Sequence, residues 1–356
     1  MTDNPEQYSH YPQQPPMAPV QAPQPGVIPL RPLDMGAMIG GAFKAVFRNW
    51  QPALLLPFLG SLIATAAGIV PAVSLFGQLI ALRDTRANPD QVLSFVGGWL
   101  LLMLVELVLV IAVSVLTQAV VTVTVSRAVL GRLTTIGQAL RAAAPRLLPL
   151  LGLSALVWLI VFGCAFVPFV AIIVLAVAAN APALGLLAFL VFVAGIVAGA
   201  YFWTSYAFAP AALVLEPAPV LTALRRSRWL VVNNWWRAFG VLLLCGVMAA
   251  FVSYLVELPV EAVQLSQVTT TSVGGTPDPT ALFNSVFSPT VLILVSVASA
   301  VVYAVGQAFM IGVTTLMYHD LRIRKESFHL PLWQMSQLPD DLSRPGTPPP
   351  HPEATI

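Results

Sequence analysis

Glu106 is the residue with the clearest potential for chemistry, because it is the one charged side chain in the apolar run 95–126. A charge at the centre of a membrane span costs at least about 2.5–3.5 kcal/mol, so we expect Glu106 to face the interior of a helix bundle. Two interpretations stay open. Either a neutral Glu106 ties helices together through hydrogen bonds to Thr117, Gln118 or Gln307, or it carries a proton or binds a substrate cation.

A pair of carboxylates, Glu257 and Glu261, stands four residues apart near the end of another apolar run. Such a pair can share a proton or bind a divalent ion, but acidic residues also commonly mark the outer membrane interface, which is the interpretation we favour. The sequence contains no hydrolase motif, nucleotide-binding loop or Cys/His metal spacing. We therefore expect no enzyme activity, no catalytic residue, no cofactor and no metal.

His319 and Asp320 adjoin at the end of the last apolar run. A histidine beside a carboxylate can carry protons. The alternative, which we favour, is an interfacial histidine next to a surface ion-pair cluster of Asp320 with Arg322 and Arg324.

The composition excludes a water-soluble globular domain. Of the 356 residues, 58% are hydrophobic and only 9% are charged, and the mean hydropathy is +0.84. Soluble domains carry about 25% charged residues. The net charge of +2 gives no reason to expect nucleic-acid binding.

Six apolar runs are long enough to cross a membrane, which takes about 20 residues in a helix. They lie at about 53–82, 95–126, 147–178, 182–215, 238–260 and 289–318. The third and fourth runs are separated by the break at Asn180 and Pro182. Because backbone groups in lipid must be satisfied internally, we expect an all-α polytopic membrane protein with six transmembrane helices in three hairpins.

The distribution of basic residues predicts the orientation. All of the 17 Lys and Arg residues except Arg83 and Arg86 fall on one side of the predicted spans. Short loops rich in Lys and Arg stay in the cytoplasm. We therefore expect a multi-pass protein of the cell (plasma) membrane with both termini cytoplasmic.

The two ends of the chain are rich in proline. Segments 1–32 and 334–356 contain too little apolar surface to order themselves, so we expect disordered cytoplasmic tails around a membrane domain at 33–333. Proline-rich tracts are also typical ligands of partner domains, so the tails are candidate contact sites for protein partners.

A short basic amphipathic segment precedes each predicted hairpin. Matching fragments begin at Ala42, Ala139 and Ala223, which indicates three units, each an interfacial helix followed by a hairpin; the alternative is that every inner loop simply needs positive charge. Such helices lie flat on a membrane, with apolar residues in the lipid and basic residues at anionic headgroups. The candidate headgroup contacts are Lys44, Arg48, Arg132, Arg141, Arg225, Arg226 and Arg228.

Gly195 and Gly199 form a GxxxG pattern in the fourth predicted span. This pattern permits close packing of helices. The contact is expected within the bundle, with a dimer as the alternative.

Several stretches together resemble a known family. They are 28–33 (IPLRPL), 40–43 (GGAF), 213–216 (LVLE), 223–227 (ALRRS), 235–240 (WWRAFG) and 318–326 (YHDLRIRKE). The chain is similar to actinobacterial multi-pass proteins labelled glycerophosphoryl diester phosphodiesterase membrane domain. Arg228-Trp229 reverses the family's order, and Ser327 stands where the family has glycine. The resemblance covers about 28–333 and implies a helical membrane domain of unassigned role; because the chain holds no catalytic barrel, it implies no phosphodiesterase activity.

The sequence thus favours a non-enzymatic scaffold or accessory component of the bacterial cell envelope that contacts anionic lipids. The alternative is a transporter or lipid-handling protein with a polar intramembrane site around Glu106.

Overall fold

The computed structural model describes residues 23–84, 89–179, 181, 184–216, 218–272 and 288–338. These residues form helices and no strand. In chain order the helices are α1 (Met35–Arg48), η2 (Gln51–Leu55), α2 (Leu56–Asp84), α3 (Pro89–Val129), α4 (Ile136–Ala143), η3 (Ala144–Arg146), α5 (Leu147–Ala178), α6 (Leu184–Tyr206), α7 (Ala209–Leu215), α8 (Val220–Val231), α9 (Trp235–Ser272), α11 (Pro289–Glu326) and α12 (His329–Gln337).

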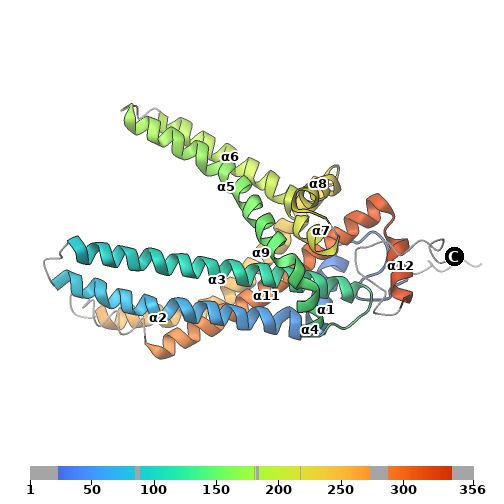
Figure 1. Ribbon diagram of the computed structural model, residues 1–356, viewed down its shortest axis with the longest axis horizontal. Coiled ribbons are helices and arrows are strands. Elements are labelled where there is room, and N and C mark those ends of the chain that lie inside the picture. The colour runs from blue at the N-terminus through green and yellow to red at the C-terminus, as the bar shows by residue number, and fades with distance from the viewer. Residues whose placement is uncertain are drawn as a thin grey trace, which may run out of the picture.

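Six helical stretches in the described residues are long and apolar enough to cross a membrane. They are Gln51–Ile69, Asp90–Val129, Ile136–Ala178, Leu184–Leu215, Trp235–Pro259 and Thr290–Glu326. They pair as three hairpins, α2 with α3, α5 with α6, and α9 with α11 (Figure 1). The predicted fold class is therefore confirmed.

Small residues bring the helices of a hairpin together. Gly199 of α6 lies against α5, where a Cβ would stand 3.4 Å from the Val161 carbonyl oxygen. Gly195, one turn earlier, is also buried. The GxxxG pattern thus packs inside its own hairpin.

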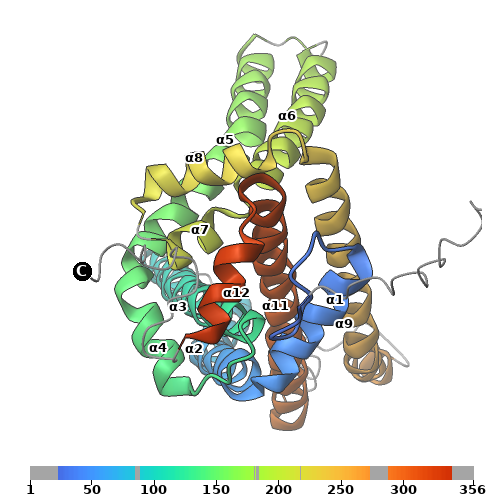
Figure 2. The same ribbon diagram turned by 90° about the vertical axis from the view of Figure 1, so that its right-hand side faces the viewer.

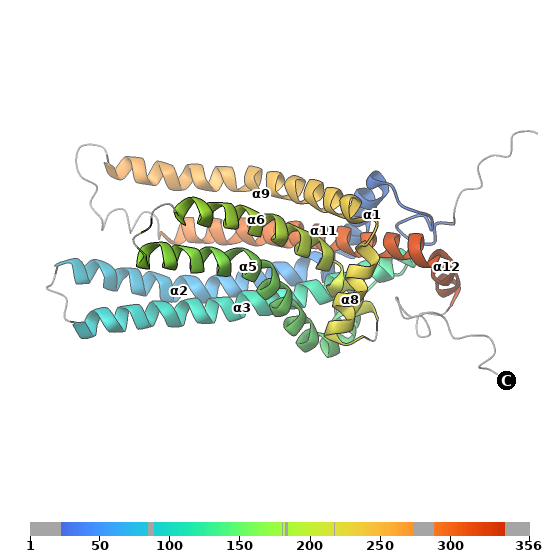
Figure 3. The same ribbon diagram turned by 90° about the horizontal axis from the view of Figure 1, so that it is seen from above.

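The short amphipathic helices all lie at one end of the bundle, which we call the capped end because α1, α4, α7, α8 and α12 cover it (Figures 1 and 3). Their apolar faces pack against the transmembrane helices and against each other. α1 buries Met38, Ala42 and Val46, and α8 buries Leu224 and Leu230. The expectation that the apolar side chains of these helices insert into lipid is wrong for the buried ones. They pack instead on the apolar ends of the spanning helices.

Residues 23–34 form an ordered segment, the N-terminal strap, that packs into the capped end. Ile28 is completely buried and Leu33 is 1% exposed. The Val27 amide donates to the Ala128 carbonyl at the end of α3 (3.2 Å). The expected disorder of 1–32 is therefore wrong for residues 23–32, because apolar side chains between the prolines supply enough buried surface. Residues 1–22 lie outside the described part of the chain.

The other end of the described chain is also longer than expected. α12 continues to Gln337, past the predicted boundary at 333. Leu332 and Met335 are buried, so the helix packs against the capped end. Residues 339–356 lie outside the described residues.

The α5–α6 hairpin diverges from the other four spanning helices (Figures 1 and 2). The separation grows from the capped end towards the far end of the hairpin. α5 buries Leu150 and Leu153 near the capped end, and none of its described side chains beyond Leu153 is buried. Its exposed apolar surface is typical of lipid contact.

Candidate functional site

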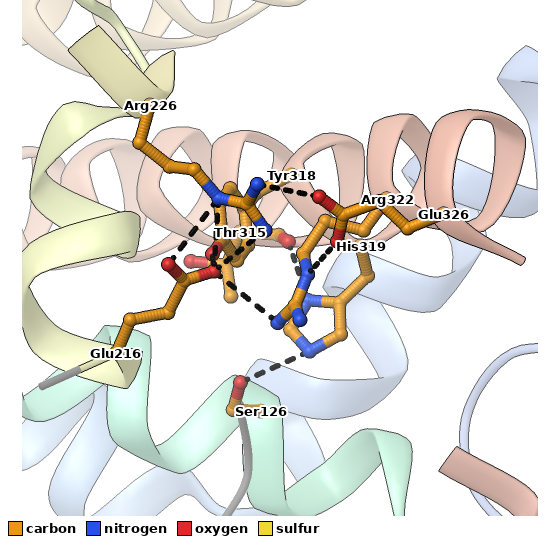
Figure 4. Close-up of polar contacts among 8 residues, drawn as sticks. All are labelled: Ser126, Glu216, Arg226, Thr315, Tyr318, His319, Arg322 and Glu326. Carbon is orange, nitrogen blue, oxygen red and sulfur yellow. Dashed lines mark hydrogen bonds and ion pairs between the residues drawn. The ribbon is translucent and has the colours of Figure 1, made fainter. Parts of the chain in front are cut away.

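A cluster of two carboxylates and two guanidinium groups joins α7, α8 and α11 at the capped end (Figure 4). Glu216, which ends α7, accepts hydrogen bonds from the Tyr318 hydroxyl and from Arg226 Nε (3.3 Å), and Arg322 Nη1 lies 3.5 Å away. Glu326 pairs with Arg226 Nη1 at 2.5 Å and with Arg322 Nε at 2.9 Å. The four charges balance, so the cluster fixes three elements with no net charge.

The electrostatics hold Arg226 in this cluster. Burial lowers the pKa of its guanidinium, but the hydrogen bond with Glu326 and the charges of Glu216 and Glu326 more than reverse this effect, so its pKa lies above the usual value. Arg322 in turn stacks on Phe328, with its guanidinium carbon 3.5 Å from the ring centroid. The cluster was not predicted, although Glu216 is a lone carboxylate just before a basic segment, which is a usable signal.

Asp320 forms a second cluster and is completely buried. Arg324 Nε lies 2.9 Å and Arg237 Nη2 3.1 Å from its Oδ2, and the Leu33 amide donates to Oδ1 at 2.7 Å. The Leu33 carbonyl also accepts from Arg237 at 2.6 Å and from Arg324 at 3.2 Å. The expected surface cluster is wrong in two respects: Asp320 is not at the surface, and Arg322 is not its partner. Residues two apart on a helix point to different sides, so Arg322 belongs to the Glu216 cluster.

His319 is completely buried between α11 and α3. Its Nδ1 lies 2.8 Å from the Thr315 carbonyl and its Nε2 lies 3.3 Å from Ser126 Oγ. A carbonyl only accepts, so Nδ1 carries a hydrogen, and in the neutral ring Nε2 then accepts from the serine hydroxyl. His319 and Asp320 thus have separate partners, and the structure does not join them as a proton-carrier pair.

Three of the seven residues expected at lipid headgroups make contacts within the protein. Arg48 Nη2 donates to the Gly131 carbonyl (3.1 Å). Arg132 donates to carbonyls at the end of α12, and Arg226 lies in the Glu216 cluster. These side chains stabilise the capped end.

The other four candidates are exposed and make no hydrogen bond or ion pair with the described residues. They are Lys44, Arg141, Arg225 and Arg228. Large apolar side chains are exposed beside them: Phe43 and Phe47 on α1, and Leu221 and Trp229 on α8. We call these exposed sides of α1, α4 and α8 the outward faces.

Glu106 lies where α3 passes α2. Its Oε2 is buried and has no hydrogen-bond partner in the described part of the chain. A Cβ on Gly68 would stand 2.5 Å from this oxygen, so glycine leaves the room for the carboxyl group. The structure does not bring Glu106 together with the predicted partners: Gln118 donates to Thr122 Oγ1 (3.3 Å), and Gln307 is exposed.

Glu257 is half-buried and Glu261 is exposed. Within the described ranges, no group of three or more His, Cys, Asp or Glu side chains is arranged to hold a metal ion.

The fold and these clusters define a multi-pass helical membrane protein whose amphipathic helices are fixed at one end by buried ion pairs. Residues 33–321 match a domain of unknown function, DUF7847. The match spans most of the chain, which therefore belongs to this family. No curated protein and no solved structure matches the chain.

Proposed function

We propose that the protein is a non-enzymatic scaffold or accessory component of the cell envelope that holds anionic lipids at the capped end. The supporting observation is the outward faces of α1 and α8, where basic side chains without a partner among the described residues stand beside exposed large apolar side chains. This combination suits a membrane surface, where an aromatic ring enters the headgroup layer and a Lys or Arg near an anionic surface contributes about 1 kcal/mol.

α8 illustrates the argument. Leu221, Arg225, Arg228 and Val232 follow each other at spacings of four, three and four residues and are all exposed, so they form one stripe. The opposite side of α8 is buried on the bundle. None of the described residues covers this stripe. The stripe contains both apolar and basic side chains, so it suits a membrane surface better than water alone.

The orientation in this proposal places the capped end in the cytoplasm of a cell with a plasma membrane. The excess of Lys and Arg at this end supports it. Both described chain ends lie near this end of the bundle (Figure 3), so they share one side of the membrane. The resemblance to the membrane domain associated with phosphodiesterases fits a helical, non-catalytic role.

The experiment is lipid analysis of the protein in native-lipid nanodiscs. Substitution of Arg225 and Arg228 by Gln is expected to lower the enrichment of anionic lipids over the bulk membrane at least twofold. The matched control replaces Arg83 and Arg86, the two basic residues that the sequence predicts on the other side of the membrane, by Gln and leaves the enrichment unchanged. Equal enrichment in both variants contradicts the proposal.

A second candidate function, transport through a site at Glu106, is supported by its buried carboxyl oxygen, which has no hydrogen-bond partner among the described residues. In proteoliposomes with an internal pH dye, this function predicts a proton flux that Glu106→Gln abolishes while the amount of inserted protein stays constant. A flux that survives in Glu106→Leu removes this candidate.

A further inference from the structure

An open depression of about 500 Å³ lies where the end of α3 meets the first turn of α4. It is lined by Arg127, Thr135, Gly137, Gln138, Arg141 and Ala142. None of these residues is acidic, two are arginines, and the N-terminus of a helix carries a partial positive charge. The depression therefore suits an anionic occupant.

Arg132 holds the end of α12 near this depression. Its backbone amide donates to the Arg127 carbonyl (3.1 Å), so it lies in the turn between α3 and α4. Its Nη2 donates to the Met335 carbonyl (3.1 Å) and to the Leu338 carbonyl (2.5 Å). Figure 2 shows α4 and α12 together at the capped end. The described chain therefore ends at a hydrogen bond from Arg132, which lies in the turn between the two helices that line the depression.

The residues that follow Leu338 are Pro339, Asp340 and Asp341. Two or three extended residues reach roughly 7–11 Å. We propose that the depression is the docking site of the chain's own acidic segment, Asp340-Asp341, whose carboxylates pair with Arg127 and Arg141.

Tethering favours this occupant over a phosphate from a lipid or from solution. A segment joined by a short linker has an effective concentration in the millimolar range, and Arg132 already fixes its beginning. A carboxylate beside an arginine also makes a charge-assisted hydrogen bond, and the segment offers two.

Docking has a consequence that rests on the proposed function. Arg141 belongs to an outward face, so a docked acidic segment competes with anionic headgroups for it. Release of the segment then exposes a basic side chain to the membrane, and the protein's lipid contacts become adjustable.

The test is disulfide cross-linking of the full chain in nanodiscs, with Cys164 and Cys245 replaced by serine. One cysteine is placed at Gly137, where a Cβ meets no atom within 4 Å, and the other at Leu342, beside the acidic pair. A disulfide needs Cα atoms within about 7 Å. We expect rapid cross-linking that slows at least tenfold in Asp340→Asn/Asp341→Asn.

Two controls sharpen the result. Glu353→Gln removes a carboxylate further along the same segment and leaves the cross-linking rate unchanged. A cysteine at Thr222, exposed on α8 of the same end, cross-links poorly with Leu342→Cys. Equal rates with and without the aspartates, or equal rates to positions 137 and 222, overturn the docking proposal.

Lipid composition separates this proposal from the proposed function. A lipid phosphate as the occupant predicts slow cross-linking in nanodiscs that contain phosphatidylglycerol and faster cross-linking in pure phosphatidylcholine, which contradicts docking as the resting state. Aspartate-dependent cross-linking in both nanodiscs supports docking. If the asparagine variant then gains no anionic lipid, docking stands and the lipid contact at Arg141 is rejected.

Discussion

Asp320 stabilises the capped end more than a surface carboxylate would, because its buried carboxylate accepts hydrogen bonds from two arginines and from the strap. Removal of one partner from a buried ion pair costs about 3–5 kcal/mol. Asp320→Asn is therefore expected to lower the free energy of unfolding in detergent micelles by about 3 kcal/mol. Glu261→Gln, which changes an exposed carboxylate, is the control and stays within about 0.5 kcal/mol of wild type. Equal effects of the two substitutions contradict the role of Asp320.

Ser327 has a left-handed backbone, with φ 55° and ψ 33°, where it ends α11. Glycine adopts this conformation without steric cost, which explains in physical terms why glycine suits this position. Since the Ser327 side chain is exposed, Ser327→Gly is expected to raise the free energy of unfolding by about 0.5–1 kcal/mol. A lower stability of this variant contradicts the prediction.

Sequence reasoning found only part of the residue-scale site. The pair of Asp320 with Arg324 follows from i,i+4 spacing. Arg237 and Leu33 are 83 and 287 residues away from Asp320 in sequence, so no local pattern reveals them. The sequence predicts Arg226 at the lipid surface because it lies in a basic segment. No local pattern indicates that Glu216 and Glu326 are its partners.

At the scale of elements, the strap depends on a close approach of backbones. A Cβ at Gly26 would stand 2.2 Å from the Val129 carbonyl oxygen and 2.3 Å from that of Ala128. Gly26→Ala is expected to dislodge the strap and to speed hydrogen exchange at the Val27 and Leu33 amides at least tenfold, while the spanning helices stay protected.

The control for this prediction is Gly40→Ala in α1, where a Cβ meets nothing within 4 Å. It leaves exchange in the strap at the wild-type rate. Unchanged exchange in Gly26→Ala as well means that the strap tolerates a shift of the backbone.

The amphipathic helices were predictable as elements, because a basic residue beside a 3.6-residue apolar period defines them. Their burial was not. Lipid and the ends of the spanning helices are both apolar, so the period of Met38, Ala42 and Val46 does not distinguish a bilayer from a protein surface.

For the whole molecule, the six spans could be predicted from the sequence, because bilayer thickness sets their length and requires apolar residues. The divergence of the α5–α6 hairpin could not, since it depends on which short helices pack between the hairpin and the bundle. The side of the membrane that the capped end faces is a prediction from charge alone.

That orientation is testable with single cysteines in a cysteine-free background. Thr222→Cys lies on α8 at the capped end and Val92→Cys near the start of α3, at the opposite end; both native side chains are exposed. In intact cells, a membrane-impermeant maleimide is expected to label position 92 and not position 222, and lysis makes both reactive. The reverse pattern contradicts the orientation.

The contact between Leu33 and Asp320 also sets an order of events during biosynthesis. The two residues are 287 positions apart, so at about 5–20 residues per second the ribosome needs roughly 15–60 s to supply the second after the first. Throughout that interval the strap lacks its contact with Asp320, although the end of α3, which it also contacts, is already made. Arg237 lacks the same carboxylate for the last 83 of those residues. The capped end is therefore complete only when the last spanning helix arrives, and a nascent chain that stalls before α11 holds the strap by its α3 contacts alone.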